Sequence, residues 1–475
     1  MSSLRIAFLA SELTPFAKTG GLADVAASLP RTLGNLRHDV RAFVPLYGSI
    51  DREAYELEPL PMESADFELY RTAIARSNVP VYFVDYPRFY DRGAIYTNDA
   101  DEPLRFIFFC RAVLEACQRL GFAADIFHVN DWQTALVPLL LKTTYAWDKL
   151  FEKTKTLLTI HNLAYQGVFG ADVYDAIGVE ERGYFDADDV RGGVVNFLKT
   201  GLLHADHLST VSPTYAQEIQ TPEQGYDLDG LLRLRADSLT GILNGVDYDE
   251  WNPSEDRFIP FQYSEKSLFR KKRNKMALVD KLGLDVSENT PLVGMVTRLS
   301  AQKGIDLLED VLPEFLSREP LALVVLGTGE TRYQAFFAGL ERQFPERVCF
   351  YRGFSNELAH WIEAAADVFL MPSRYEPCGL NQMYSLKYGT VPIVRKTGGL
   401  ADSVRPFDPA TGDGTGIVFD HYTPAGVRWA LDTALGLYRD PDAWRAVVTN
   451  GMAEDFSWER QAELYVAIYD QLLIH

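Results

Sequence analysis

Short runs of apolar residues, bounded by turn residues, recur along the whole chain and alternate with helical patterns. Strands that are apolar on both faces and are separated by helices are typical of a parallel sheet that helices cover on both sides. The runs form two series, one in each half of the chain. The first is Arg5–Ala10, Val40–Pro45, Val79–Asp85, Asp125–Asp131, Thr156–His161 and His207–Ser212, and the second is Leu292–Thr297, Leu321–Gly327, Val348–Tyr351, Val368–Met371, Val391–Val394 and Gly416–Phe419. The sequence therefore predicts an α/β protein with two doubly wound domains.

A turn-rich segment separates the two series. Ile242–Pro253 contains an Asn-Gly turn and ends in Asn-Pro, which is typical of a linker. A chain of 475 residues is also too long for one ordinary domain. We predict a first domain over residues 1–243, a second over 244–456 and a final helix over 457–475. The helical pattern of that last segment could pack on either domain.

The composition excludes several classes of partner. There are 46 basic and 66 acidic residues, a net charge of −20, whereas nucleic acids and anionic membranes attract a basic face. The apolar run near the N-terminus, Ile6–Ala10, is too short for a signal peptide, and no run approaches the ~18 residues of a membrane span. The four cysteines have no metal-ligand spacing. Four cysteines in 475 residues fit a reducing compartment. We expect a cytoplasmic protein without nucleic acid, membrane or metal as a partner.

One heptapeptide, Lys-Thr-Gly-Gly-Leu-Ala-Asp, occurs twice, at Lys18–Asp24 and at Lys396–Asp402. Both copies come after an apolar run and before a helical pattern. Free backbone N–H groups at a helix start, together with a lysine, suit an anion such as phosphate. The first hypothesis is therefore two half-sites in two domains that close on one phosphorylated ligand. For the second copy a simpler interpretation is expected to hold, namely that its glycines only permit a tight strand–helix turn.

Three charged residues stand near strand ends of the second domain. Arg298 and Lys303 follow its first strand, and ligands of open α/β sheets bind at the carboxyl ends of strands. Arginine and lysine suit diphosphate oxygens, although two cations in a loop are more often surface residues. Glu376 lies in a turn between proline and glycine at a helix start and is the strongest single candidate for a functional residue. Cys378, in the same turn, is expected to pack.

The first domain has polar residues at two strand ends. Asp131 could simply cap a helix, and His161 could be a packed loop histidine. However, both strand ends belong to the same predicted edge of the sheet, where Asp131, His161 and Asn162 could bind sugar hydroxyls. Both interpretations remain open from the sequence alone.

Several of these motifs follow one another in an order that resembles a known family. The motifs are Lys18–Val25, His161–Gly167, Asn244–Asp247 with Trp251–Pro253, Arg298 with Gln302–Gly304, and Arg374–Leu380. Together they resemble the bacterial glycogen synthases of the ADP-glucose type and the related plant starch synthases. The resemblance covers essentially the whole chain.

The resemblance implies two Rossmann-like domains facing across a cleft, the GT-B architecture, with the last helix crossing back onto the first domain. It implies transfer of glucose from ADP-glucose to the non-reducing end of an α-1,4-glucan such as glycogen, with anomeric retention and without metal or cofactor. A transferase for UDP-glucose or another acceptor is the alternative within enzymes. A non-catalytic two-domain sugar-binding protein is the alternative outside them, but a binder of neutral sugar does not need the cations Lys18, Arg298 and Lys303.

Residue roles follow from the same resemblance. The implied catalytic residues are Glu376, His161, Arg298, Lys303 and Asp131. The implied donor-binding residues are Lys18, Arg298, Lys303, Tyr351, Gly379, Leu380 and Asn381, with Tyr351 placed to stack on adenine and Tyr96 as a weaker candidate for that base. The implied sugar and acceptor residues are Glu12, Asn162 and Asp131. Position 381 is usually threonine in the family, and Asn381 can still donate a hydrogen bond there. Relatives with other donors have a second glutamate where this chain has Tyr384.

The chemistry of this transfer agrees with the residues. Departure of glucose leaves negative charge on the diphosphate, and preplaced cations stabilise such charge without a metal. Glycosidases use two carboxylates that flank the bond, and no second carboxylate beside Glu376 is evident. Attack by the acceptor hydroxyl on the same face, with the leaving phosphate taking its proton, is therefore favoured over double displacement.

Overall fold

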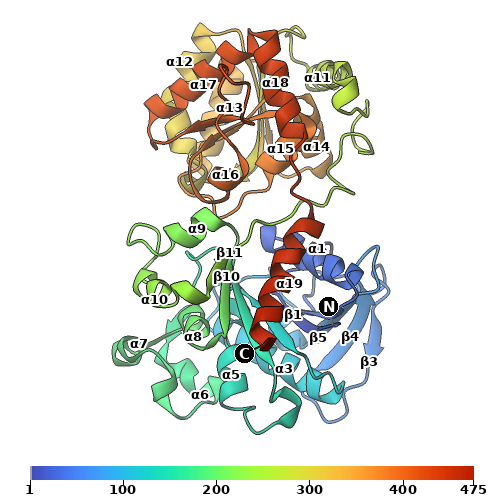
Figure 1. The fold of residues 1–475 in the computed structure, drawn as a ribbon, viewed down its shortest axis with the longest axis vertical. Coiled ribbons are helices and arrows are strands. Elements are labelled where there is room, and N and C mark those ends of the chain that lie inside the picture. Colours follow the sequence, from blue (N-terminus) through green and yellow to red (C-terminus); the bar gives the residue numbers. More distant parts are fainter. Residues whose placement is uncertain (1–2, 475) are drawn as a thin grey trace. The chain divides into compact units, whose positions relative to one another are not determined.

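The computed structural model describes residues 3–474 and divides into two compact units. The first unit contains the chain up to Gly245 together with the segment that begins at Trp458, and the second is Val246–Ser457. Figure 1 shows both units and labels many of their helices and strands. Each unit contains its own sheet, as the two series of apolar runs predict.

The first unit is built on a nine-stranded sheet with the order β11-β10-β7-β6-β1-β2-β5-β4-β3. Its strands are parallel except at the β5–β4–β3 edge, which is antiparallel. The bounds are β1 (Arg5–Leu9), β2 (Asp39–Pro45), β3 (Glu58–Leu60), β4 (Glu68–Ala73), β5 (Pro80–Asp85), β6 (Ile126–Asn130), β7 (Lys155–Ile160), β10 (His207–Thr210) and β11 (Leu239–Gly241). The central strand β6 is buried along its whole length, as expected for a strand that helices cover on both faces.

The first unit also contains a set of α-helices and one small additional pair of strands. They are α1 (Gly21–Asn35), α2 (Pro87–Tyr90), α3 (Glu102–Arg119), α4 (Asp131–Thr134), α5 (Val137–Lys142), α6 (Tyr174–Ile177), α7 (Ala187–Gly192), α8 (Phe197–His204), α9 (Pro213–Glu218), α10 (Asp229–Leu234) and α19 (Trp458–Ile474). After β6 the chain forms two short helices, α4 and α5, rather than one, because Pro138, in the first turn of α5, has no N–H with which to continue α4. A small antiparallel pair, β8 (Val168–Gly170) and β9 (Val194–Asn196), was not predicted.

The C-terminal helix α19 belongs to the first unit. It packs against α1 and is drawn in red beside the first sheet in Figure 1. Its Tyr469 hydroxyl lies 2.7 Å from Nδ1 of the buried His128 in β6. This polar contact fixes the end of the chain to the central strand.

The second unit has a six-stranded parallel sheet with the order β14-β13-β12-β15-β16-β17. The strands are β12 (Leu292–Leu299), β13 (Ala322–Gly329), β14 (Val348–Arg352), β15 (Val368–Met371), β16 (Val391–Arg395) and β17 (Ile417–Phe419), and the helices are α11 (Phe269–Leu282), α12 (Ile305–Arg318), α13 (Thr331–Gln343), α14 (Asn356–Ala365), α15 (Asn381–Tyr388), α16 (Gly398–Ser403), α17 (Pro424–Tyr438) and α18 (Pro441–Met452). The strand order reverses at β12, between β13 and β15. Such a switch point is where open α/β sheets bind their ligands.

No helix among residues 3–474 is long and apolar enough to cross a membrane.

Candidate active site

The first heptapeptide is held by the carboxylate of Glu12. The Glu12 side chain is buried and accepts hydrogen bonds from the backbone N–H groups of Thr19 and Gly20, the latter at 3.1 Å, and from the Thr19 hydroxyl at 2.6 Å. Glu12 thus occupies the two N–H groups just before α1, and the use of the N–H groups of α1 itself for phosphate stays a prediction. The cation next to them is accessible: Lys18 is exposed, and its Nζ lies 2.6 Å from Asp24 at the end of the same heptapeptide.

Tyr96 supports Glu12. Its hydroxyl donates to Glu12 at 2.6 Å and lies 2.7 Å from the Ser11 hydroxyl, and burial raises the pKa of Tyr96 well above the usual value. Tyr96 therefore orders the loop around Lys18. The Tyr96 hydroxyl is therefore bound within the protein, and this contact gives no support to the weaker suggestion that Tyr96 stacks on adenine.

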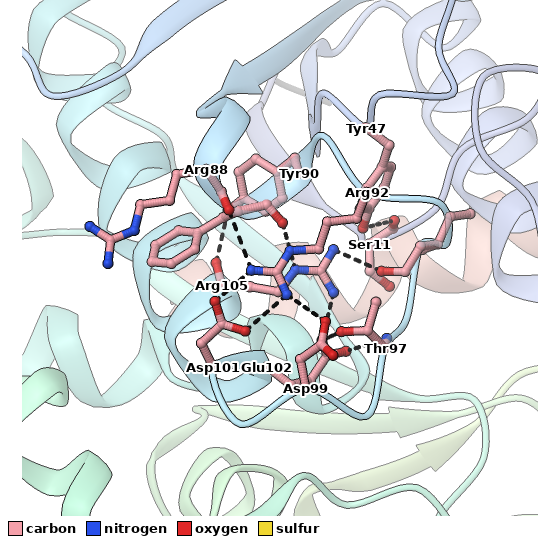
Figure 2. A network of polar contacts seen from close by, with 12 residues as sticks. Ser11, Tyr47, Arg88, Tyr90, Arg92, Thr97, Asp99, Asp101, Glu102 and Arg105 are labelled. Carbon is pink, nitrogen blue, oxygen red and sulfur yellow. Dashed lines mark hydrogen bonds and ion pairs between the residues drawn. The ribbon is translucent and has the colours of Figure 1, made fainter.

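The segment that contains Tyr96 is anchored by the polar network in Figure 2. The fully buried Arg105 donates to Glu102 at 2.6 Å and to the carbonyl of Ile95 at 3.0 Å. Glu102 in turn accepts from the backbone and the hydroxyl of Thr97. The residues on both sides of Tyr96 are thus fixed to a buried ion pair, which removes most of the freedom of its loop.

Asp131 and His161 come together at the ends of β6 and β7. The Asp131 carboxylate accepts the backbone N–H of His161 at 2.7 Å, and Nε2 of His161 lies 2.9 Å from the side-chain oxygen of Asn130. Asp131 is the first residue of α4 and its φ is 56°, which is uncommon for a residue other than glycine. It does not cap its own helix, because the cap position is Asn130. The helix-cap interpretation is wrong, and the strained backbone is of the kind that clusters at functional sites.

The protonation of this pair is shifted in opposite directions. Burial raises the pKa of Asp131 to about 7, and the N–H groups of His161 and Asn162 oppose this rise. Burial lowers the pKa of His161 to about 3, so its imidazole is neutral at pH 7. Asp131 thus titrates close to neutrality beside a neutral histidine that can donate or accept. Such shifts are typical of sites that bind or transform a ligand.

The second unit brings Lys303 and Glu376 together. Nζ of Lys303 lies 2.6 Å from Oε2 of Glu376, and the Ser373 hydroxyl donates to the same oxygen at 3.1 Å. Glu376 is buried, with 5% of its surface exposed. Arg298 lies within β12, near its end, rather than after it as predicted, and its side chain is exposed. Among residues 3–474 the Arg298 guanidinium has no ion-pair partner, which leaves it available for an anion.

The second heptapeptide lies beneath the turn that carries Glu376. The N–H of Gly399 donates to the carbonyl of Glu376 at 3.1 Å. A Cβ on Gly398 would clash with that carbonyl oxygen, and one on Gly399 would clash with the carbonyl oxygen of Cys378. The φ of Gly398 is 43°, which glycine adopts without strain. The expectation that these glycines serve turn geometry is confirmed.

Three of the other predicted donor residues lie at the start of α15, and Tyr351 lies near the end of β14. Gly379 and Leu380 directly precede α15, and Asn381 is its first residue. Tyr351, near the end of β14, is 45% exposed and free to stack on a base. Tyr384 lies on the ring of Trp251, with centroids 3.9 Å apart. Cys378 is buried and packs, as expected.

Sequence reasoning missed Ser373 and Gln382, and it gave Tyr96 a role other than its bond to Glu12. Ser373 and Tyr96 bind the two glutamates directly, and Gln382 is fully buried and donates to the carbonyl oxygens of Cys378 and Gly379. A polar residue shortly after the end of a buried strand was the only signal for Ser373. In residues 3–474 no group of three or more His, Cys, Asp and Glu side chains could hold a metal ion.

Comparison with known proteins identifies both halves of the chain. Residues 5–234 match the starch synthase catalytic domain, and residues 281–446 match the glycosyl transferases group 1. A glycogen synthase of Anaeromyxobacter sp. (strain Fw109-5) is 47% identical over 99% of both chains, and that of Thermotoga maritima is 43% identical over 99% of both.

Solved structures agree with the sequence matches. The catalytic domain of starch synthase IV from Arabidopsis thaliana, bound to ADP and acarbose, covers 100% of both chains with 34% identity and a TM-score of 0.92. A sucrose-phosphate synthase from Thermosynechococcus elongatus, 18% identical with a TM-score of 0.62, shares the fold. The predicted resemblance and the predicted GT-B fold class are both confirmed.

Proposed function

The chain belongs to the glycogen synthase family, and we propose that it transfers glucose from ADP-glucose to the non-reducing end of an α-1,4-glucan, with retention at the anomeric carbon. The observation that carries this proposal is the Lys303–Glu376 pair at the switch point of the second sheet, with the exposed Arg298 near the end of β12. The starch synthase IV relative was solved with ADP and acarbose, which supports a nucleotide and a glucan-like ligand for this chain.

Arg298, Lys303 and Lys18 are proposed to stabilise the departing ADP. The charge that develops on the diphosphate needs cations that are already in position, because this electrostatic contribution is usually the largest in catalysis. Lys303 and Lys18 are already ordered by their bonds to Glu376 and Asp24. Because Lys18 belongs to the first unit and the other two cations to the second, we propose that one donor molecule uses both units.

Glu376, Asp131 and His161 are proposed to bind the transferred glucose. Lys303 and Ser373 both bind Oε2 of Glu376, which orients the carboxylate so that Oε1 can accept from a sugar hydroxyl. Asp131 and the neutral His161 offer an acceptor and a polar imidazole from the first unit. Asn162 and Glu12 are proposed on the acceptor side, with Glu12 acting through the loop that it orders.

The acceptor hydroxyl is proposed to attack from the face that the leaving group vacates. The Glu376 carboxylate is already bound by Lys303 and Ser373, which favours an orienting role over that of the nucleophile that double displacement needs. The hydroxyl proton then passes to the leaving phosphate. We also propose a cytoplasmic location, because all four cysteines are free thiols.

A donor and acceptor assay tests this function. The purified chain is incubated with ADP-glucose or UDP-glucose, each with and without glycogen and with and without EDTA, and nucleotide release is followed. We expect faster release from ADP-glucose, dependence on glycogen and full activity in EDTA. Comparable or faster turnover of UDP-glucose would overturn the donor assignment. Release that ignores glycogen would overturn the acceptor, and loss in EDTA that magnesium restores would overturn the metal-free mechanism.

A further inference from the structure

We propose that Asn381 is a positioning residue that holds Arg298 in place, and that its side chain is not a ligand of the diphosphate. This inference rests on the proposed function, because it assigns Arg298 to the departing ADP. It changes the role that sequence resemblance implied for Asn381, which was a direct contact with phosphate.

The first observation is a gap in the sheet beside β12. On the β13 side, pairing continues to the end of β12, at Leu299. On the β15 side, pairing ends at Gly294, opposite Phe369. The carbonyl of Leu292 accepts from Asp367 on this second side. Since successive residues of a strand point to alternate neighbours, the carbonyls of Gly294 and Val296 face the same side. The carbonyl of Val296 is therefore the first on this side of β12 that has no strand partner.

Asn381 supplies the missing donor. Its Nδ2 lies 2.7 Å from the carbonyl oxygen of Val296, which is a well-formed hydrogen bond. Both residues are partly buried, where an unpaired carbonyl is destabilising. Asn381 is also the first residue of α15, directly after Gly379 and Leu380. The side chain therefore ties the start of α15 to β12 at a point two residues before Arg298.

The two cations of the second unit differ in how they are held. Lys303 is fixed through its own side chain, by the 2.6 Å bond to Glu376. The Arg298 guanidinium is exposed and has no ion pair among residues 3–474, so its position depends on the backbone of β12. That backbone is paired with Thr328 on one side, and on the other it is held at Val296 by Asn381. Loss of the Asn381 amide should therefore displace Arg298 and leave Lys303 in place.

A double-mutant cycle separates this role from the two alternatives. The variants are Asn381→Ala, Arg298→Ala and their combination, with Asn381→Leu as a variant of similar side-chain shape that cannot donate. The control cycle pairs Asn381→Ala with Lys396→Ala, whose residue lies outside the proposed site. For each protein the thermal midpoint is measured first, and kcat and KM for ADP-glucose and the dissociation constant of ADP are then measured at a temperature where all variants are folded.

We expect Asn381→Ala and Asn381→Leu each to lower kcat about tenfold, with less than about a twofold change in KM, in the range of measured coupling between neighbouring residues. In the Arg298→Ala protein the same change should cost less than about twofold, whereas beside Lys396→Ala the whole tenfold loss should remain.

Three results would overturn the inference. An equal loss in the Arg298→Ala background would show that Asn381 does not act through Arg298. A rise in KM and in the ADP dissociation constant would show direct contact with the diphosphate. Wild-type kcat in Asn381→Leu would show that the donor to Val296 is not needed. A wild-type chain that does not transfer glucose from ADP-glucose would instead contradict the proposed function and is recognised before any variant is compared.

Discussion

The two copies of Lys-Thr-Gly-Gly-Leu-Ala-Asp have the same residues and opposite surroundings. In the first copy Lys18, Gly20 and Gly21 are exposed, and a Cβ on either glycine would meet nothing. In the second copy Gly398 and Gly399 are buried against the turn that carries Glu376. Both copies begin a helix, α1 and α16, although α16 begins one residue earlier in the heptapeptide. The first copy presents a cation on the surface, and the second packs against the turn that carries Glu376.

This difference shows that a short motif predicts local structure better than function. Carboxylate or carbonyl oxygens accept N–H groups in both loops: Glu12 through its side chain in the first, and Glu376 through its backbone in the second. The two loops differ in their exposure to solvent. An exposed loop can meet a ligand, whereas a buried loop can only position its neighbours.

The largest effects should come from the proposed catalytic residues of the second unit. We expect Arg298→Ala and Lys303→Ala each to lower kcat by about 10²–10³-fold, by analogy with removal of one oxyanion donor. Glu376→Ala should be equally severe, because the carboxylate orients the sugar and is buried with Lys303. Steady-state kinetics with ADP-glucose and glycogen measure this. A raised KM with normal kcat would mean that these residues only anchor the ground state.

The glycines give the sharpest contrast in stability. Gly399→Ala should lower the free energy of unfolding by about 1–3 kcal/mol, because its Cβ would overlap the backbone of Cys378. Gly21→Ala, at the matched position of the first copy and in open space, should be neutral or stabilising by about 0.5–1 kcal/mol. Denaturant unfolding of both variants checks this. Equal destabilisation by the two substitutions would remove the distinction between the copies.

The lysines give the matched contrast in activity. Lys18→Ala should lower kcat/KM for ADP-glucose by about 10- to 100-fold, the usual range for hydrogen bonds to a charged group. Lys396→Ala should change it less than about twofold, because that side chain is exposed and its ion pair with Asp420, at 4.0 Å, is long and weak. If Lys396→Ala were as damaging as Lys18→Ala, the second copy would also have to bind the donor.

The smallest effect concerns pH and belongs to the first unit. Asp131, with a pKa of about 7, becomes charged as pH rises, so kcat/KM should increase about tenfold between pH 6 and pH 8. Because the folded pKa lies above the unfolded value, the stability from protonated Asp131 is full below about pH 4 and is lost as pH rises through 7. An asparagine side chain does not titrate and tolerates a positive φ, so Asp131→Asn should flatten the rate profile. An unchanged profile would assign the dependence to another group.

The sequence predicted the strands well, but it did not predict the hydrogen bonds that hold the site residues in place. Strands such as β6 and β15 are buried apolar runs, which leave a clear pattern. The edge strand β3 has three residues, two of them exposed, and leaves none. The bond from Tyr96 to Glu12 joins residues 84 positions apart, and the bond from Asn381 to Val296 spans 85. Such pairs depend on how the strands are arranged, which no local pattern records.

Calorimetric titration with ADP tests most directly the central claim that one donor uses both units. We expect one ADP per chain, and weaker binding in Lys18→Ala of the first unit and in Lys303→Ala of the second, each by about 1.5–3 kcal/mol, with Lys396→Ala close to wild type. Wild-type affinity in Lys18→Ala, or two ADP molecules bound independently per chain, would contradict the claim.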